Sequence, residues 1–247
     1  MRSDSVKLRP LSARSVVLSL LLGAHPPELP VTDLVRGVER LGVSEPTVRV
    51  ALSRMVAAGD LVRTDAVCRL SDRLVDRQRR QDESVEPQTK AWRGQWELVV
   101  ITTTGRGPAD RAELRSDLAG LRLAELREGL WLRPANLRRS WPEHVNSVVE
   151  HFTARPEEEP KVLAARLWPL AEWAATAKAL LNHFTTASDP AVRLTAAAAI
   201  VRHLLADPVL PAELLPADWP ADALREAYAG YRVELGDLAR GARSGLT

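Results

Sequence analysis

The sequence has a single cysteine, Cys68, among its 247 residues. One cysteine excludes a disulfide within the chain and any zinc site built from several cysteines. The five histidines are scattered and form no HExxH or equivalent metal pair. The glycine-framed serine of a hydrolase elbow, a Cys–His nucleophile signature and the glycine fingerprint of a dinucleotide site are missing as well. We therefore expect no metal, no cofactor and no enzymatic activity, and we interpret Cys68 as a small apolar residue in a strand.

Long apolar runs are missing too, although apolar residues make up 45% of the chain. The longest candidate, Val16 to Leu22, is seven residues long and includes Ser19, whereas a membrane span needs about 20. No cleavage-like site flanks it, so a signal peptide is not expected. A chain of this length predicts two or three domains of about 70–150 residues each. The composition therefore favours a soluble, cytoplasmic protein.

Neither sign of charge dominates the whole chain, but the two signs are unevenly distributed. Residues 1–82 contain 14 Lys and Arg against 10 Asp and Glu, whereas residues 83–247 contain 20 against 22. The basic excess thus lies in the first third of the chain. Such a distribution is typical of a module that faces phosphates and is joined to a body that need not contact them.

The first 82 residues have the pattern of a winged helix-turn-helix. Caps and helical apolar spacing predict three helices, and two short strands around a turn follow them. The segment from Ala24 to Pro30 contains three prolines and is predicted to be a loop. The predicted helices cover residues 12–23, 31–41 and 44–58, and the strands cover 61–63 and 67–70. This order of elements predicts a DNA-binding domain over residues 1–82.

The third helix carries the functional prediction because its two sides differ. Apolar residues at helical spacing predict a buried stripe made of Val48, Leu52, Met55 and Val56. The opposite side is mostly polar and fits a major groove, while two arginines of the strands are placed for phosphates. The candidate DNA-binding residues are Thr47, Arg49, Val50, Ser53, Arg54, Arg63 and Arg69. The alternative is an ordinary three-helix domain with solvated arginines.

The rest of the chain predicts two further domains. Residues 92–156 alternate strands and helices in the order β-α-β-β-α-β, which is typical of a ferredoxin-like domain. After a linker near residues 155–160, helical apolar spacing extends through most of residues 161–247. The expected fold class is therefore α+β and mainly helical, with a winged helix-turn-helix, a middle ferredoxin-like domain and a C-terminal helical domain.

Three stretches of the chain are specific when taken in order. They are SARSVVLSLLLG at residues 12–23 with LGVSEPTVRVALSRMVAAGDL at 41–61, WRGQWELVV at 92–100 with GLWLRP at 129–134, and DPVLPAELLPADWP at 207–220. Together they resemble the PaaX family of regulators, which are best known as repressors of phenylacetic acid catabolism. The resemblance implies a homodimer that binds a palindromic operator in double-stranded DNA as a repressor. It also implies release by an acyl-CoA effector, phenylacetyl-CoA in the best-known members. Within the family's V-R-x-A-L-S-R pattern, it assigns DNA reading to Thr47, Arg49, Ser53 and Arg54.

Two departures from the family pattern matter. Family wings often carry a Gly-Arg pair and an aromatic residue, which the short wing RTDAVCRL lacks, so the wing contacts stay open. The middle domain also resembles the small ferredoxin-like nucleases of CRISPR adaptation, which place a catalytic aspartate at the end of the first strand. Here that position is Thr102 to Thr104, which offers no carboxylate for a metal. Nuclease activity is therefore not expected.

An effector site is predicted from the tryptophans and from nearby arginines. The chain has seven tryptophans but only two phenylalanines and two tyrosines, and every tryptophan lies beyond residue 91. Most of them are expected to pack in cores and interfaces. The candidate effector-binding residues are Trp131, for stacking on a ring, and Arg133, Arg193 and Arg202, for CoA phosphates. The alternative is that these arginines bridge helices.

Two other functions stay open at this point. One is an RNA-binding or nuclease-like accessory protein that uses the ferredoxin-like domain. The other is a protein-interaction adaptor whose winged domain makes only dimer contacts. Comparing how strongly the protein is retained on duplex DNA and on RNA would distinguish the RNA-binding protein from a DNA-binding regulator. The absence of a salt-dependent DNA affinity would favour the adaptor.

Overall fold

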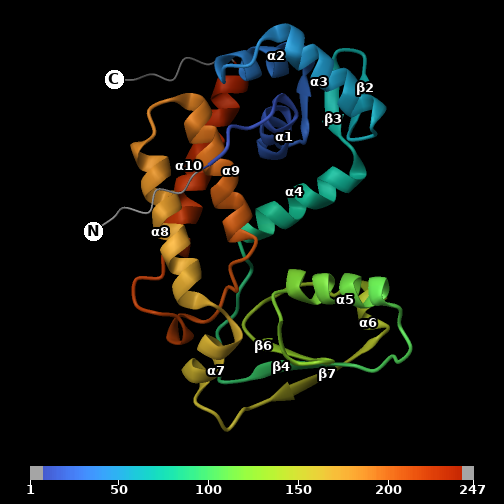
Figure 1. Ribbon diagram of the computed structural model, residues 1–247, viewed down its shortest axis with the longest axis vertical. Helices are drawn as coiled ribbons and strands as arrows, with labels where there is room; N and C mark the ends of the chain where they lie inside the picture. Colours follow the sequence, from blue (N-terminus) through green and yellow to red (C-terminus); the bar gives the residue numbers. More distant parts are fainter. Residues whose placement is uncertain (1–7, 241–247) are drawn as a thin grey trace. The chain divides into compact units, whose positions relative to one another are not determined.

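The computed structural model describes residues 8–240 and shows a mixed α+β fold (Figure 1). Contacts divide the chain into two compact units. The first, here called the helical unit, comprises the chain up to Val85, Thr176–Leu204 and the chain from Pro220 on. The second, the sheet unit, comprises Glu86–Ala175 and Leu205–Trp219. The C-terminal region is thus shared between the units, and the three consecutive domains expected over residues 1–82, 92–156 and 161–247 stay a prediction.

The helical unit contains the predicted helices and hairpin of the N-terminal region together with the last helices of the chain. Its elements are α1 (Ala13–Gly23), β1 (Glu28–Pro30), α2 (Val31–Arg40), α3 (Glu45–Ala57), β2 (Leu61–Thr64), β3 (Val67–Leu70), α4 (Asp72–Val85), most of α8 (Leu170–Thr186), α9 (Pro190–Leu204) and α10 (Ala221–Arg240). The side chain of Ser12 caps α1 by accepting a hydrogen bond from the backbone of Ser15. Gly59, at a φ of 70°, follows α3 and allows the chain to reverse into the hairpin.

The small sheet of this unit has the order β1-β3-β2, with antiparallel neighbours. The prediction of a loop over residues 24–30 is wrong for its last three residues, because Glu28, Leu29 and Pro30 form β1 opposite Arg69, Cys68 and Val67. Proline is tolerated there because β1 is an edge strand. Cys68 is fully buried in β3, which confirms its interpretation as a small apolar strand residue, and burial raises the pKa of its thiol.

The last helix of the chain is built into the N-terminal helices of the same unit. α10 packs against α1, α2, α4 and α9. The contact with α2 is close, since a Cβ added at Gly37 would lie 3.3 Å from the Cα of Ala239. Arg40 in α2 also donates a hydrogen bond to the carbonyl oxygen of Leu238, at 2.9 Å. The helices that position α3 are therefore themselves held by the C-terminal helix.

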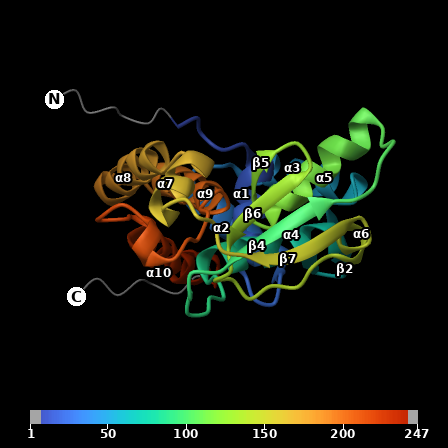
Figure 2. The same ribbon diagram turned by 90° about the horizontal axis from the view of Figure 1, so that it is seen from below.

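The sheet unit contains a four-stranded antiparallel sheet with the order β5-β6-β4-β7 (Figure 2). Its elements are β4 (Trp96–Ile101), α5 (Pro108–Gly120), β5 (Ala124–Arg127), β6 (Leu130–Pro134), α6 (Glu143–Asn146), β7 (Val149–Ala154), α7 (Pro160–Leu167), the start of α8 and a 3-10 helix, η1 (Ala212–Leu214). The succession β-α-β-β-α-β confirms the predicted ferredoxin-like domain. Arg122, at a φ of 64°, forms a turn between α5 and β5.

Each face of this sheet packs against an apolar core at the central strands β4 and β6, which explains why these two strands are apolar, whereas the edge strand β7 is largely exposed. Val99 and Trp131 face the core that Leu114 and Leu118 of α5 complete. Trp96 and Leu132 face the opposite core, which α7 and part of the segment 205–219 cover. All seven tryptophans belong to the sheet unit. None of the helices within residues 8–240 is long and apolar enough to cross a membrane.

Candidate nucleic-acid interface and effector pocket

The inner side of α3 is buried, as its apolar spacing predicts. Val48, Leu52 and Met55 expose at most 3% of their surface and face α1 and α2, the helices against which α3 packs. The prediction is wrong for Val56, which is 36% exposed. A residue eight positions after Val48 is rotated by about 80° from it around the helix axis, which takes Val56 to the edge of the stripe.

The outer side of α3 is accessible, and part of it borders a hollow beside the start of α1. Thr47, Arg49, Val50, Ser53 and Arg54 are all exposed, and Val50 exposes half of its surface. An exposed valine in the middle of a polar helix face is an apolar contact available to a partner. The structure therefore brings the five predicted residues of this helix together on one accessible face.

The polar side chains of this face interact only with side chains of the first turn of α3 or of its N-cap, or with none among the described residues. The hydroxyl groups of Ser44 and Thr47 lie 2.9 Å apart, and Ser44 occupies the N-cap position without bonding a backbone N–H. Arg49 donates from Nε to Oε1 of Glu45, one turn earlier, at 2.7 Å. The side chain of Arg54 makes no hydrogen bond or ion pair with another of the described residues. Its guanidinium is thus available for a base edge or a phosphate.

The two wing arginines lie on neighbouring strands but do not form a pair. Both are exposed, Arg63 in β2 and Arg69 in β3. Arg63 is directly opposite Cys68, whereas Arg69 is opposite Val62. Residues opposite each other share a face and successive residues alternate, so the two arginines point to opposite faces of the hairpin. At most one of them faces the same partner surface as α3 unless the partner surrounds the hairpin.

A hollow of about 400 Å³ lies between α3 and the start of α1. Thr47, Val50 and Arg54 line it from α3, and Arg14 and Asp60 line it as well. The sequence gives no sign of the last two, because 46 positions separate them. Helical periodicity predicts which side of one helix is buried, but it does not predict which distant residues contact each other.

The predicted effector residues are divided between the two units. Trp131 is in the core of the sheet unit, 4% exposed, with the guanidinium carbon of Arg115 5.8 Å from its ring centre. Arg193 and Arg202 lie in α9, in the helical unit. Arg193 forms an ion pair with Glu234 and lies over the ring of Phe184, whereas the exposed Arg202 donates back to its own helix. Their effector role stays a prediction.

Arg133 is fully buried and holds the loop that contains Val209. Its guanidinium donates to the carbonyl oxygens of Val209 and Arg122, at 3.1 and 3.2 Å, and to Oδ1 of Asn136, at 2.8 Å. Burial, reinforced by the positive charge of Arg139, lowers the pKa of Arg133 to about 9, so the side chain is charged at neutral pH. In this structure the side chain is therefore not accessible to an effector.

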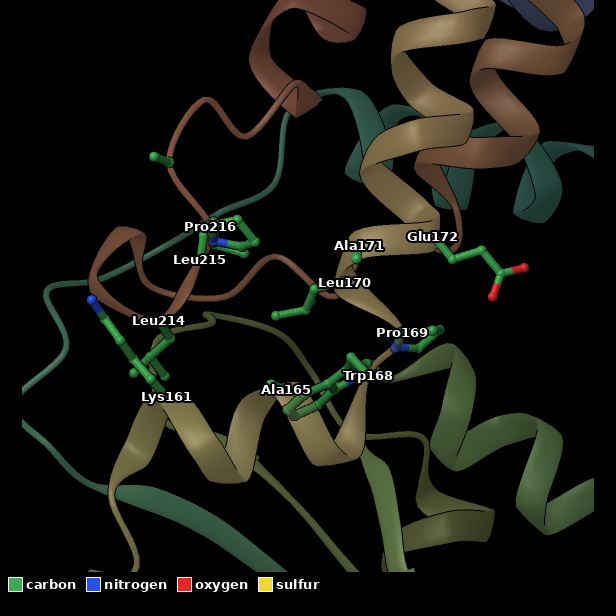
Figure 3. Close-up of a pocket in the computed structure, with 11 residues that line it drawn as sticks. Lys161, Ala165, Trp168, Pro169, Leu170, Ala171, Glu172, Leu214, Leu215 and Pro216 are labelled. Carbon is green, nitrogen blue, oxygen red and sulfur yellow. The ribbon is translucent and has the colours of Figure 1, made fainter. Parts of the chain in front are cut away.

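A different surface of the sheet unit has the properties of a ligand pocket (Figure 3). It is a hollow of about 610 Å³ between α7, the start of α8 and the segment from Leu214 to Ala217. Trp168, Leu170 and Leu215 give it apolar walls, and Lys161 stands at one rim. Glu172 also borders it, but its carboxylate points away from the apolar side chains. The described residues that line this pocket include none of those predicted for the effector.

The geometry defines an α+β protein with a ferredoxin-like sheet unit and a helical unit that exposes the polar side of α3. Three family models match the chain in succession: "PaaX-like protein" over residues 12–77, "PaaX protein central Cas2-like domain" over 89–161 and "PaaX-like protein C-terminal domain" over 168–242. The chain therefore belongs to the PaaX family, a family of transcriptional regulators. The resemblance inferred from the sequence is confirmed.

A solved structure supports the same assignment. The chain is similar to the uncharacterized protein Rv0674 from Mycobacterium tuberculosis, with 47% identity and a TM-score of 0.82. The similarity covers 94% of this chain and 99% of that one. No curated protein matches the chain.

Proposed function

We propose that the chain binds double-stranded DNA with a winged helix-turn-helix formed by α1, α2, α3 and the hairpin of β2 and β3. The observation that carries this proposal is the division of α3 into a buried side and an accessible side. Val48, Leu52 and Met55 anchor the helix, while Arg49, Val50, Ser53 and Arg54 stay exposed. A major groove admits one α-helix, whose outer residues then meet the base edges.

The residues of this face have distinct roles in the proposed complex. Arg54, whose side chain has no partner among the described residues, reads a guanine edge or holds a phosphate. Thr47 and Ser53 are short and allow close approach, and Val50 contacts a thymine methyl group. Arg49 exchanges its ion pair with Glu45 for a phosphate. Arg63 or Arg69 contacts the backbone beside the groove.

We further propose that the chain acts as a homodimeric repressor on a palindromic operator. One recognition helix reads only a few base pairs, so specificity in a genome calls for two half-sites about one helical turn apart. Sedimentation of the free chain and of its complex with duplex DNA tests this. Two chains per duplex support the proposal, and one chain per saturated duplex contradicts it.

The proposed DNA binding is tested with a labelled duplex from the region upstream of the chain's own gene. Binding is titrated by fluorescence anisotropy against the same length of single-stranded RNA and of unrelated duplex. The proposal expects a preference for the upstream duplex and an affinity that falls with salt as counterions are released. Tighter binding to the RNA would favour an RNA-binding accessory protein. No salt-dependent DNA affinity would favour an adaptor.

The effector is proposed to be an acyl-CoA, and the pocket of Figure 3 is its best-supported place. Apolar walls suit an acyl group, and Lys161 at the rim suits an anionic group. Calorimetry with a panel of acyl-CoAs tests it, with Ala165→Trp to fill the hollow and Val162→Trp as the control. Val162 is exposed on the same helix but does not line the pocket. If the heat of acyl-CoA binding is retained by the Ala165→Trp variant but lost in the Val162→Trp variant, this location is contradicted.

A further inference from the structure

Asp60 joins three helices of the helical unit with a single buried carboxylate. Arg14 at the start of α1 donates to Oδ2 from Nη2 and Nε, at 2.8 and 3.1 Å. Arg73 in the first turn of α4 donates to Oδ1 from Nη2, at 2.6 Å. The backbone of Asp60 also accepts from Ser71 and donates to Met55, so it is fixed to the end of α3.

The two arginines are held firmly but are not buried. The side chain of Asp60 is 5% exposed, whereas those of Arg14 and Arg73 are 53% and 71% exposed. One carboxylate neutralises one of the two guanidinium groups, so the cluster keeps a net positive charge. Arg14 has Nη1, and Arg73 has Nε and Nη1, without an acceptor among the described residues. These N–H groups are donors that a further anion can use.

This cluster borders the face of α3 that is proposed to enter the major groove. Arg14 and Asp60 line the same hollow as Thr47, Val50 and Arg54. Arg14 from α1 and Arg54 from α3 both line the hollow, and the buried Asp60 is the one acidic residue among the described residues that line it. The net positive charge of the residues that line the hollow is complementary to a phosphodiester strand. The volume of the hollow, about 400 Å³, leaves room for part of such a strand.

We propose that Arg14 and Arg73 are phosphate contacts, which Asp60 positions beside α3. This inference rests on the proposed DNA binding and adds two residues to it. The sugar-phosphate backbone of one strand lies along the hollow, where Arg14 and Arg54 hold successive phosphates. Arg73, on the other side of Asp60, holds the backbone near the wing.

The buried carboxylate gives these contacts an advantage over free surface arginines. A free arginine loses its rotamer freedom when it binds a phosphate, and this loss weakens the contact. The hydrogen bonds to Asp60 have already restricted Arg14 and Arg73 in the free protein. Asp60 is thus a positioning residue that contacts no DNA itself.

The test compares Arg14→Ala and Arg73→Ala with the control Arg166→Ala on the upstream duplex and on an unrelated duplex. Arg166 forms an ion pair with Glu158 and is 56% exposed, close to the 53% of Arg14, but it belongs to the sheet unit. Removing the arginine that holds one phosphate lowers the affinity about tenfold on both duplexes and reduces the salt slope by about one. Arg166→Ala leaves affinity and slope at the wild-type values.

A second measurement separates a phosphate contact from a structural role. Neutral methylphosphonates replace single phosphates of the upstream duplex. At the phosphate that Arg14 contacts, the replacement lowers the duplex affinity of the wild type but not that of Arg14→Ala. If Arg14→Ala instead lost affinity because α3 is displaced, no single phosphate would show this difference. The conservative Arg14→Lys and Arg73→Lys variants, which keep the charge, recover most of the salt slope.

The outcomes distinguish the two proposals. If the wild type binds no duplex DNA, the proposed function fails and this inference fails with it. If the wild type binds and both alanine variants match Arg166→Ala, only the inference is overturned. It is also overturned if the variants lose affinity for the upstream duplex alone with an unchanged salt slope, because phosphates carry no sequence information.

Discussion

Gln81 in α4 donates a hydrogen bond from its side-chain amide to the phenolic oxygen of Tyr228 in α10, at 2.5 Å, across 147 positions of sequence. Arg232 in the same helix pairs with Asp82, at 3.3 Å. The C-terminal helix is therefore part of the core that supports the proposed DNA-binding helices. A change in the position of α10 would reach α1 and α2 without crossing a flexible linker.

Removal of α10 should unfold the helical unit. The helix buries Leu224, Tyr228, Tyr231 and Leu235, each worth about 1.5–3 kcal/mol, and a whole domain is stable by only about 5–15 kcal/mol. A chain that ends at residue 219 should lose helical circular dichroism and duplex binding. Tryptophan fluorescence should stay native-like, because all seven tryptophans belong to the sheet unit. A cooperative helical melt at the wild-type temperature would contradict this.

The stability of the helical unit should fall at alkaline pH through Tyr228. Burial raises the pKa of Tyr228 to about 12 from 10.0, and Asp82 reinforces the shift. Between these values the folded chain keeps the phenolic proton and the unfolded chain releases it. The stabilisation is thus complete below pH 10 and is lost as the pH rises toward 12, by at most roughly 1.4 kcal/mol per pH unit.

Tyr228→Phe provides the comparison for this pH effect. At neutral pH the variant should be less stable by about 1 kcal/mol, because the amide of Gln81 loses its buried acceptor. From pH 10 upward its free energy of unfolding should fall less steeply than that of the wild type. Urea unfolding, followed by circular dichroism at each pH, measures both. Parallel curves would show that Tyr228 does not carry the effect.

Arg133 should be structural for the sheet unit. Arg133→Met leaves buried carbonyl oxygens of Arg122 and Val209 with fewer donors. The expected cost is about 3 kcal/mol of unfolding free energy, from hydrogen bonds to a charged group. Tryptophan fluorescence in urea should show an earlier transition, while Arg166→Met should not shift it. A wild-type transition for Arg133→Met would mean that the loop around Val209 does not depend on this side chain.

The two sides of α3 should respond differently to substitution. Leu52→Ala should cost about 2–4 kcal/mol of stability, because Leu52 is 3% exposed in the core. Val50→Asp should change stability by less than about 0.5 kcal/mol, because Val50 is half exposed. Duplex affinity should nevertheless fall sharply for Val50→Asp, since a carboxylate faces the phosphates. Equal affinities of wild type and Val50→Asp would place the DNA elsewhere.

The parts of the fold that depend on local pattern could be predicted from the sequence. The apolar spacing of Val48, Leu52 and Met55 predicted the buried side of α3, and the succession of strands and helices predicted the ferredoxin-like domain. The exposed face of α3 follows from the same periodicity. Val56 shows the limit, because periodicity alone does not say how wide the covering surface is.

The parts that depend on distant partners could not be predicted. The strand β1 exists only because β3, about 40 residues later, pairs with it. The carboxylate of Asp60, which follows α3, binds Arg14 of α1 and Arg73 of α4. No spacing in the sequence relates these three residues. The pocket beside Trp168 is likewise assembled from two segments about 50 residues apart. The effector residues chosen from composition therefore missed it.

The most direct test of the central claim is the anisotropy titration of the upstream duplex with the wild type and with Arg54→Ala. The side chain of Arg54 is exposed and has no partner among the described residues, so its removal should leave the fold intact. The account predicts a salt-dependent wild-type affinity that Arg54→Ala weakens by about 10–100-fold, corresponding to about 1–3 kcal/mol. If Arg54→Ala binds the duplex as tightly as the wild type does, and its circular dichroism is unchanged, the accessible side of α3 does not read DNA.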